Sequence, residues 1–192
     1  MNFRLLAIIT LLSSISFIGF GQGMAVYAGS SSMKTQLPSL TTDGHAHTGY
    51  HVGADGRLGD DSFYFTVGLQ YHKLDFNATP DFSFNVTDPS FGILKGKGGL
   101  AFKIFEVNKQ IVTRIRLMGA LDYLLNTPES GTVDNPSNLV FNEGVAGAIG
   151  GLEIDIYFLT LNFEYQKGFF RSVKETDDSS MDFITMSLGV NF

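Results

Sequence analysis

The chain has 192 residues, a formal net charge of -6 and an isoelectric point near 5.0, so it lacks the basic excess that nucleic-acid binding requires. It contains no cysteine, which excludes disulfide bonds, thiolate metal sites and a lipid anchor on an amino-terminal cysteine. Hydrophobic residues make up 44% and charged residues 17%, a balance that fits a membrane β-barrel better than a helical membrane protein.

The first 21 residues have the features of a secretory signal peptide. Arg4 precedes an apolar run from Leu5 to Phe20, and the triplet Gly19-Phe20-Gly21 predicts cleavage before Gln22. The alternative is a membrane anchor, but the run is shorter than the ~20 residues that a spanning helix needs. No second apolar run of that length follows, so we expect one domain, residues 22–192, that would cross a membrane with strands.

Eight stretches of this domain alternate between apolar and polar residues with a period of two, as half-buried β-strands do. The alternation is clearest at 63–72, where Phe63 and Phe65 alternate with Tyr64 and Thr66, and at the end of the chain. The expected strands are residues 24–30, 47–57, 63–72, 93–105, 111–125, 144–156, 160–169 and 181–192.

The connections between these strands alternate in length. Long segments rich in Ser, Thr, Gly, Pro, Asn and Asp follow the first, third, fifth and seventh strands, and short turns follow the second, fourth and sixth. Short periplasmic turns, long extracellular loops and an even strand count are typical of outer-membrane barrels. The sequence therefore predicts an all-β fold, an eight-stranded antiparallel up-and-down transmembrane β-barrel located in the cell outer membrane.

The distribution of side-chain size distinguishes this barrel from a soluble one. A soluble lipocalin-like carrier would have its apolar faces inward. The apolar faces of the expected strands carry many large side chains, whereas an eight-stranded interior is only just wide enough to be filled. The opposite faces carry small residues such as Gly53, Gly68 and Gly99, which suit a crowded lumen. We expect the apolar faces to meet lipid, with the soluble ligand carrier as the alternative.

Charged residues recur on the polar faces of the expected strands. Arg114 and Arg116 should lie inside the barrel near its periplasmic end, facing Glu153, Asp155 and Glu164, because buried charges are tolerable only when they are paired. The alternative is a hydrated lumen without specific pairs. The predicted lumen charge network comprises Lys95, Lys97, Lys103, Arg114, Arg116, Asp122, Glu153, Asp155 and Glu164.

The four histidines, His45, His47, His51 and His72, are candidates for a metal site. A hairpin centred near Gly59 would place His47 across from His72, with His51 on the same face. Neutral imidazole binds zinc, copper or nickel, so His47, His51 and His72 could hold such an ion at the extracellular mouth. The alternative is a polar lining that hydrogen-bonds to its neighbours, and we expect no cofactor.

Three motifs make the chain similar to a known family. The stretches Thr48-Gly49-Tyr50-His51-Val52-Gly53, Phe63-Tyr64-Phe65 and Ser187-Leu188-Gly189-Val190-Asn191-Phe192 resemble the PorT-like outer-membrane β-barrels of Bacteroidota. The resemblance implies eight strands with both termini in the periplasm. It also implies that the terminal aromatic Phe192 is similar to the signal read by the barrel-insertion machinery. The family carries no shared catalytic motif, and some members are linked to secretion machinery.

Two classes of function remain at this point. The first is a non-enzymatic integral outer-membrane protein that stabilises the envelope or offers its extracellular loops to an envelope protein; eight strands enclose too narrow a lumen for an open channel. The second is a barrel enzyme acting on lipid or peptide. Its candidate catalytic residues would be His72 with Asp75 or Asp43, although no nucleophile motif accompanies them. Expected partners are outer-membrane lipids and the insertion machinery.

Overall fold

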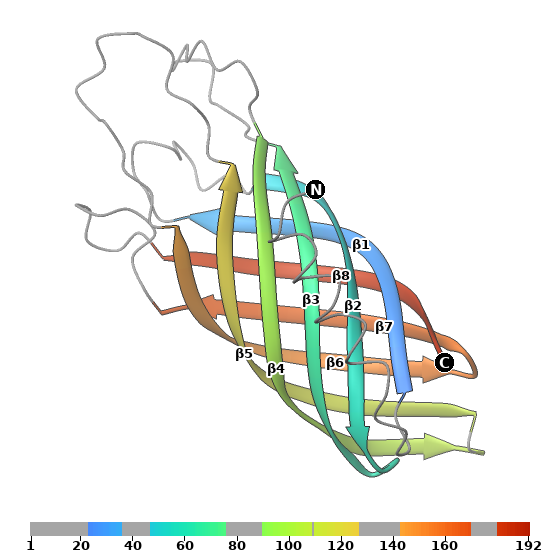
Figure 1. The fold of residues 1–192 in the computed structure, drawn as a ribbon. Coiled ribbons are helices and arrows are strands. Elements are labelled where there is room, and N and C mark those ends of the chain that lie inside the picture. The colour runs from blue at the N-terminus through green and yellow to red at the C-terminus, as the bar shows by residue number, and fades with distance from the viewer. Residues whose placement is uncertain (1–22, 36–46, 76–89, 109, 127–142, 170–179) are drawn as a thin grey trace, which may run out of the picture.

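The protein is an eight-stranded barrel. A computed structural model describes residues 23–35, 47–75, 90–108, 110–126, 143–169 and 180–192. The strands are β1 (Gly23–Thr35), β2 (His47–Gly59), β3 (Phe63–Asp75), β4 (Ser90–Val107), β5 (Ile111–Asn126), β6 (Gly144–Ile156), β7 (Leu159–Gly168) and β8 (Met181–Asn191). Each strand pairs antiparallel with its neighbour in sequence, and β1 pairs with β8 to close the sheet (Figure 1). The predicted all-β fold, an eight-stranded antiparallel up-and-down barrel, is confirmed.

The two ends of the barrel differ in how the strands are joined. Residues 60–62, 108–110 and 157–158 connect β2 to β3, β4 to β5 and β6 to β7, and we call this end the turn side. The longer connections all leave from the opposite end, the loop side. The predicted alternation of long and short connections is therefore confirmed. No helix in the described part of the chain is long and apolar enough to cross a membrane.

The register of the strands fixes the tilt of the barrel. One circuit along paired residues starts at Asn191, passes Ala25, Asp55, Gly68, Lys97, Ala120, Gly147 and Gly168, and returns to β8 level with Met181. Asn191 and Met181 lie ten residues apart, so the stagger is ten residues over eight strands. A stagger of this size tilts the strands by roughly 40° and leaves an interior that side chains fill.

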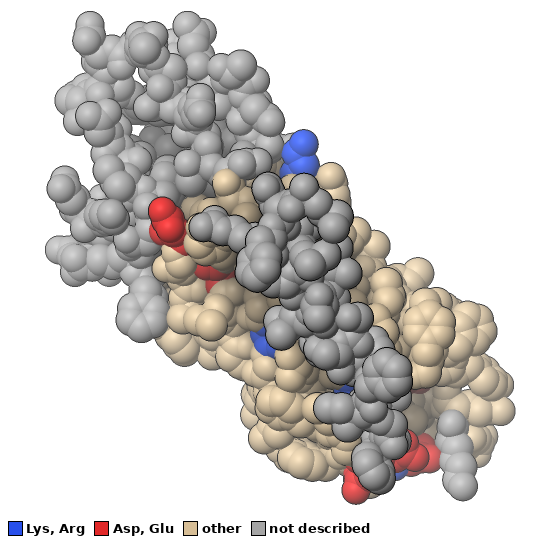
Figure 2. Space-filling view, in the orientation of Figure 1, with Lys and Arg blue, Asp and Glu red and all other residues tan. Residues whose placement is uncertain are grey.

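The outer face of the barrel is apolar and the inner face is polar. Outward side chains include Phe65, Leu69, Leu117 and Leu188, which are 41%, 50%, 58% and 55% exposed. The side chains that alternate with them are buried in the lumen, and most of these are polar or charged. The face drawn in Figure 2 is accordingly mostly uncharged. This polarity is the reverse of that in a water-soluble barrel, because the apolar surface surrounds a polar core.

The strands extend further than the alternation alone predicted. β1 continues to Thr35 and β4 runs from Ser90 to Val107, both beyond their expected limits. On β4 the pairing with β5 shifts between Lys103 and Phe105, and both Ile104 and Phe105 are exposed. A bulge of this kind breaks the period of two, so sequence alternation cannot follow the strand past it.

Candidate functional site

Among the described residues, ten charged side chains lie in the lumen, and we call them the lumen network. Its five cations face five carboxylates, so the network carries no net charge. Their side chains are at most 12% exposed, and every cation has at least one carboxylate within ion-pair distance. The members are Arg57, Lys95, Lys97, Arg114, Arg116, Asp55, Asp122, Glu153, Asp155 and Glu164. Charge balance matters here because a buried charge without a partner is strongly destabilising.

Arg116 is the centre of the network. From β5 it reaches across the lumen to Asp55 on β2, with Nη2 2.5 Å from Oδ2. Its Nη1 lies 3.1 Å from Glu164 and 3.6 Å from Glu153. Nη1 also donates to Asn162 at 3.2 Å. One planar guanidinium thus joins carboxylates from three strands, a geometry that a lysine could not provide.

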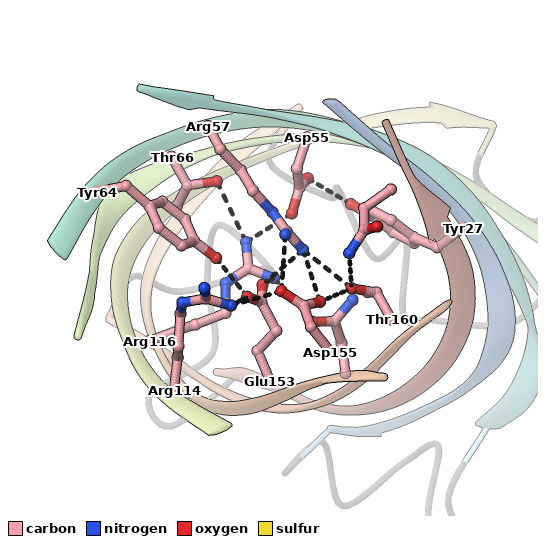
Figure 3. A network of polar contacts seen from close by, with 12 residues as sticks. Tyr27, Asp55, Arg57, Tyr64, Thr66, Arg114, Arg116, Glu153, Asp155 and Thr160 are labelled. Carbon is pink, nitrogen blue, oxygen red and sulfur yellow. Dashed lines mark hydrogen bonds and ion pairs between the residues drawn. The ribbon is translucent and has the colours of Figure 1, made fainter. Parts of the chain in front are cut away.

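Two further arginines clamp the carboxylates of β6 at the turn side (Figure 3). Arg57 donates hydrogen bonds from both terminal nitrogens to the Asp155 carboxylate, at 2.9 and 3.2 Å. Arg114 Nη1 lies 2.5 Å from Asp155 and 3.3 Å from Glu153. The Tyr64 hydroxyl donates to Glu153 at 2.5 Å, and the two guanidinium groups lie 5.5 and 5.3 Å from its ring centre. This end of the lumen is closed by charge-assisted bonds rather than by apolar packing.

The lysines of β4 extend the network toward the loop side. Lys97 Nζ lies 2.8 Å from Glu164 and 3.3 Å from Asp55. The Tyr27 hydroxyl donates to Asp55 at 2.6 Å. Lys95 is less well held, because its Nζ is 3.7 Å from Asp122 and 4.1 Å from the centre of the Phe183 ring. The density of strong pairs therefore falls from the turn side to the loop side.

The structure brings together eight of the nine residues predicted for the charge network. Lys103 is the exception, since it pairs with Glu106 at 2.6 Å at the partly exposed turn-side rim. Lys103 is opposite Arg114 in the register, on the face of the lumen, but it lies at the turn-side end of β4, where Glu106 beyond the bulge is its partner. The prediction omitted Arg57, although it shares the face of Asp55 two residues earlier in β2. The alternation of faces along β2 therefore predicts that the side chain of Arg57 also points into the lumen.

His47, His51 and His72 are buried on the loop side of the lumen network. The hairpin register pairs His51 with His72, and His47 is opposite Met33, so the predicted pairing of His47 with His72 is wrong. The cause is the turn: β2 continues through Gly59 and the chain reverses at 60–62, not around Gly59. His45 lies outside the described residues.

A serine occupies the space between the two paired histidines. Ser31 Oγ lies 2.9 Å from Nδ1 of both His51 and His72, and Gln70 Oε1 lies 3.3 Å from His72 Nε2. In the described part of the chain, no three His, Asp or Glu side chains are placed to hold a metal ion. The geometry is that of a hydrogen-bonded lining.

An apolar layer seals the loop-side end of the lumen, and we call it the loop-side plug. Each of its seven side chains is at most 6% exposed, and together they form one contact cluster supplied by β1, β3, β4, β5, β6 and β8. Its members are Met33, Leu74, Ile93, Leu124, Val145, Met181 and Phe183. Buried side chains therefore occupy the lumen from the network at the turn side to the plug at the loop side.

The residues suggested for an enzyme do not form a site among the described residues. His72 faces the lumen, is fully buried and bonds to Ser31 beneath the plug. Its predicted partner Asp43 and the side chain of Asp75 lie outside the described part of the chain. His72 is therefore directed away from the outer surface, where a lipid or peptide substrate would arrive.

Comparison with known proteins identifies the fold. No family model matches the chain, and no curated protein matches its sequence. Among solved structures, Neisserial surface protein A superposes with a TM-score of 0.53 at 14% identity, covering 90% of this chain and all of that one. The outer membrane enzyme PagL gives a TM-score of 0.54 at 8% identity, covering 88% and 98%. The PorT-like resemblance stays a prediction, and what the comparisons show is that this chain has the eight-stranded fold of outer-membrane β-barrels.

Proposed function

We propose that this protein is an integral, non-enzymatic outer-membrane β-barrel that acts through its outer surface and its loops rather than through its lumen. The observation that carries the proposal is the inverted polarity of the barrel, in which apolar side chains face out and ten paired charges face in. An apolar exterior is stable in lipid and not in water. The shortest strand, β7, has 10 residues, which is enough to span a bilayer when tilted.

The sealed lumen supports a role without transport. The buried side chains of the loop-side plug and the lumen network argue against an open route for solutes through the barrel. Partners would then meet the protein at the segments that connect the strands on the loop side, which we place outside the cell. An envelope protein bound there fits the predicted role, and the PorT-like resemblance adds secretion machinery as one class of partner.

The carboxyl terminus supports membrane assembly by the insertion machinery. Phe192 is 78% exposed, and its backbone exchanges hydrogen bonds with Met24 at 2.8 and 3.2 Å. The closing strand is thus paired to its last residue and presents an aromatic side chain outward. We infer that the insertion machinery reads this terminal strand before β1 closes on it.

Gel mobility and conductance test the proposal together. A closed barrel has no edge from which to unravel, so the unboiled protein should migrate faster than the boiled protein and should resist carbonate extraction. In planar bilayers it should show no stable conductance. Equal mobility with release by carbonate would contradict membrane insertion, and stable channel openings would contradict the sealed lumen.

A further inference from the structure

The outer wall of the barrel has a polar patch that the sealed lumen does not explain. Among the strand residues whose side chains the structure describes, four charged ones face outward, and all four lie at the loop side: Lys34, Lys73, Lys167 and Asp182. Lys167 Nζ lies 2.7 Å from Asp182, so these two charges neutralise each other. Neither Lys34 nor Lys73 lies within ion-pair distance of a described carboxylate, although Asp182, which is held by Lys167, is opposite Lys34 in the strand register.

Hydroxyl groups fill the wall between the two unpaired lysines. Tyr50 is opposite both Lys73 and Ser30 in the strand register, and Ser32 is opposite Thr48. Ser30, Lys34, Thr48 and Tyr50 are exposed, while Ser32 and Lys73 are partly exposed. We call this surface the rim patch, and it consists of Ser30, Ser32, Lys34, Thr48, Tyr50 and Lys73 on β1, β2 and β3.

The rim patch occupies one side of the barrel and does not form a ring around it. At the same end, Lys167 on β7 and Asp182 on β8 form a neutral pair. On β4, β5 and β6 the outward side chains there are apolar or aromatic, including Leu94, Tyr123, Leu125 and Ala146. A general adaptation to lipid headgroups would place cations around the whole circumference. The localised patch instead indicates one preferred ligand position.

We propose that the rim patch binds the phosphate-bearing headgroup of a lipid in the loop-side leaflet. The inference rests on the proposed membrane placement. A lysine facing lipid costs several kcal/mol at the bilayer midplane and little near the interface, which places Lys34 and Lys73 at headgroup level. Phosphate is the anionic group of lipids at that level, and lysine binds it as a point charge. The serine and threonine hydroxyls between the lysines can donate to phosphate or sugar oxygens.

Lipid retention in native mass spectrometry tests the proposal. The purified barrel, released from detergent micelles, is mixed with phosphorylated lipid A, with the same lipid after enzymatic removal of its phosphates, or with inorganic phosphate alone. The wild type should retain the phosphorylated lipid about 30-fold better than the dephosphorylated one, which at 1.4 kcal/mol per tenfold is about 2 kcal/mol for two lysines. Equal retention of the two lipids would overturn the proposal.

Substitutions assign the effect to the patch. The double variant Lys34→Gln/Lys73→Gln should lose the preference, Lys34→Arg/Lys73→Arg should keep it, and the matched control Lys103→Gln at the turn side should not change it. Loss in the control as well would show that only net charge matters and would overturn the site. Direct binding of inorganic phosphate that displaces the lipid would show a free-anion site instead. Heat-modifiable migration of each variant confirms folding, and its failure in the wild type would contradict the membrane placement separately.

Discussion

The lumen network and the loop-side plug fill the same barrel by opposite chemistry. The network joins side chains from five strands through ion pairs, and each member is needed to neutralise others. The plug joins side chains from six strands through apolar contact alone. Removing one charged group should therefore disturb all its partners, whereas trimming one plug residue leaves only a local cavity.

Replacing Arg116 by Met should give the largest loss of stability. The substitution leaves Asp55, Glu153 and Glu164 with one fewer cation in a buried site where Arg116 is 1% exposed. We expect the free energy of unfolding to fall by about 3–5 kcal/mol. Urea unfolding in lipid vesicles measures it.

Lys103→Met is the matched control for this prediction. Lys103 pairs with Glu106 at the partly exposed rim, and such pairs contribute about 0–1 kcal/mol. The double variant Arg116→Met/Asp55→Asn should cost less than the sum of its single changes, because it removes one charge of each sign. Similar losses in the free energy of unfolding for Arg116→Met and Lys103→Met would contradict a larger contribution of the buried network than of the rim pair.

Trimming the plug should have the next largest effect. Leu74 is fully buried in the plug, and Leu74→Ala should lower the free energy of unfolding by about 2–4 kcal/mol through lost burial and a residual cavity. Leu69, on the same strand, faces outward and is 50% exposed. Because lipid replaces the lost contacts there, Leu69→Ala should cost less than about 1 kcal/mol. A greater cost at Leu69 would contradict the assigned faces.

Two glycines of β2 offer a smaller contrast between the inside and the outside of the barrel. A Cβ on Gly53 would lie 2.8 Å from the ring of Tyr27, which bonds to Asp55, whereas a Cβ on Gly56 would have nothing closer than 3.8 Å. We expect Gly53→Ala to destabilise the barrel by about 1–3 kcal/mol and Gly56→Ala to change stability by less than about 0.5 kcal/mol. Vesicle unfolding of both variants measures the contrast, and equal effects would contradict the crowding of the lumen at Gly53.

The smallest expected effect is at the turn between β2 and β3, whose position pairs His51 with His72. Asp60 accepts hydrogen bonds from the backbone N–H groups of Phe63 at 2.9 Å and Ser62 at 2.8 Å. These bonds hold the pKa of the Asp60 carboxyl below its usual range. The folded state therefore takes up a proton less readily than the unfolded state, so this stabilisation is present above the pKa of a free aspartate and disappears as the pH falls through the folded value.

An NMR titration of the Asp60 carboxyl measures this shift. Asp60→Asn should retain the turn and lose this part of the acid dependence, because the amide oxygen still accepts both bonds but does not titrate. A midpoint at or above that of aspartate in an unstructured peptide would contradict the arrangement of the turn.

The sequence predicted much of the candidate site because strand alternation assigns each side chain to a face. Arg114, Arg116, Glu153 and Glu164 could be placed in the lumen from their parity alone. Parity also gives the face of Lys103, but it could not show that Lys103 pairs with Glu106 at the rim, because a bulge lies between them and leaves no clear mark in a pattern of period two.

The number of strands, the alternation of long and short connections and the face of most residues follow from the sequence alone, because these depend on local period and turn composition. Which residues meet across the lumen does not follow from it. The partner of His72 depends on where one turn reverses, and the three carboxylates around Arg116 depend on a stagger that accumulates over eight strands. Register is a property of strand pairs and barrel closure, so no single stretch of sequence contains it.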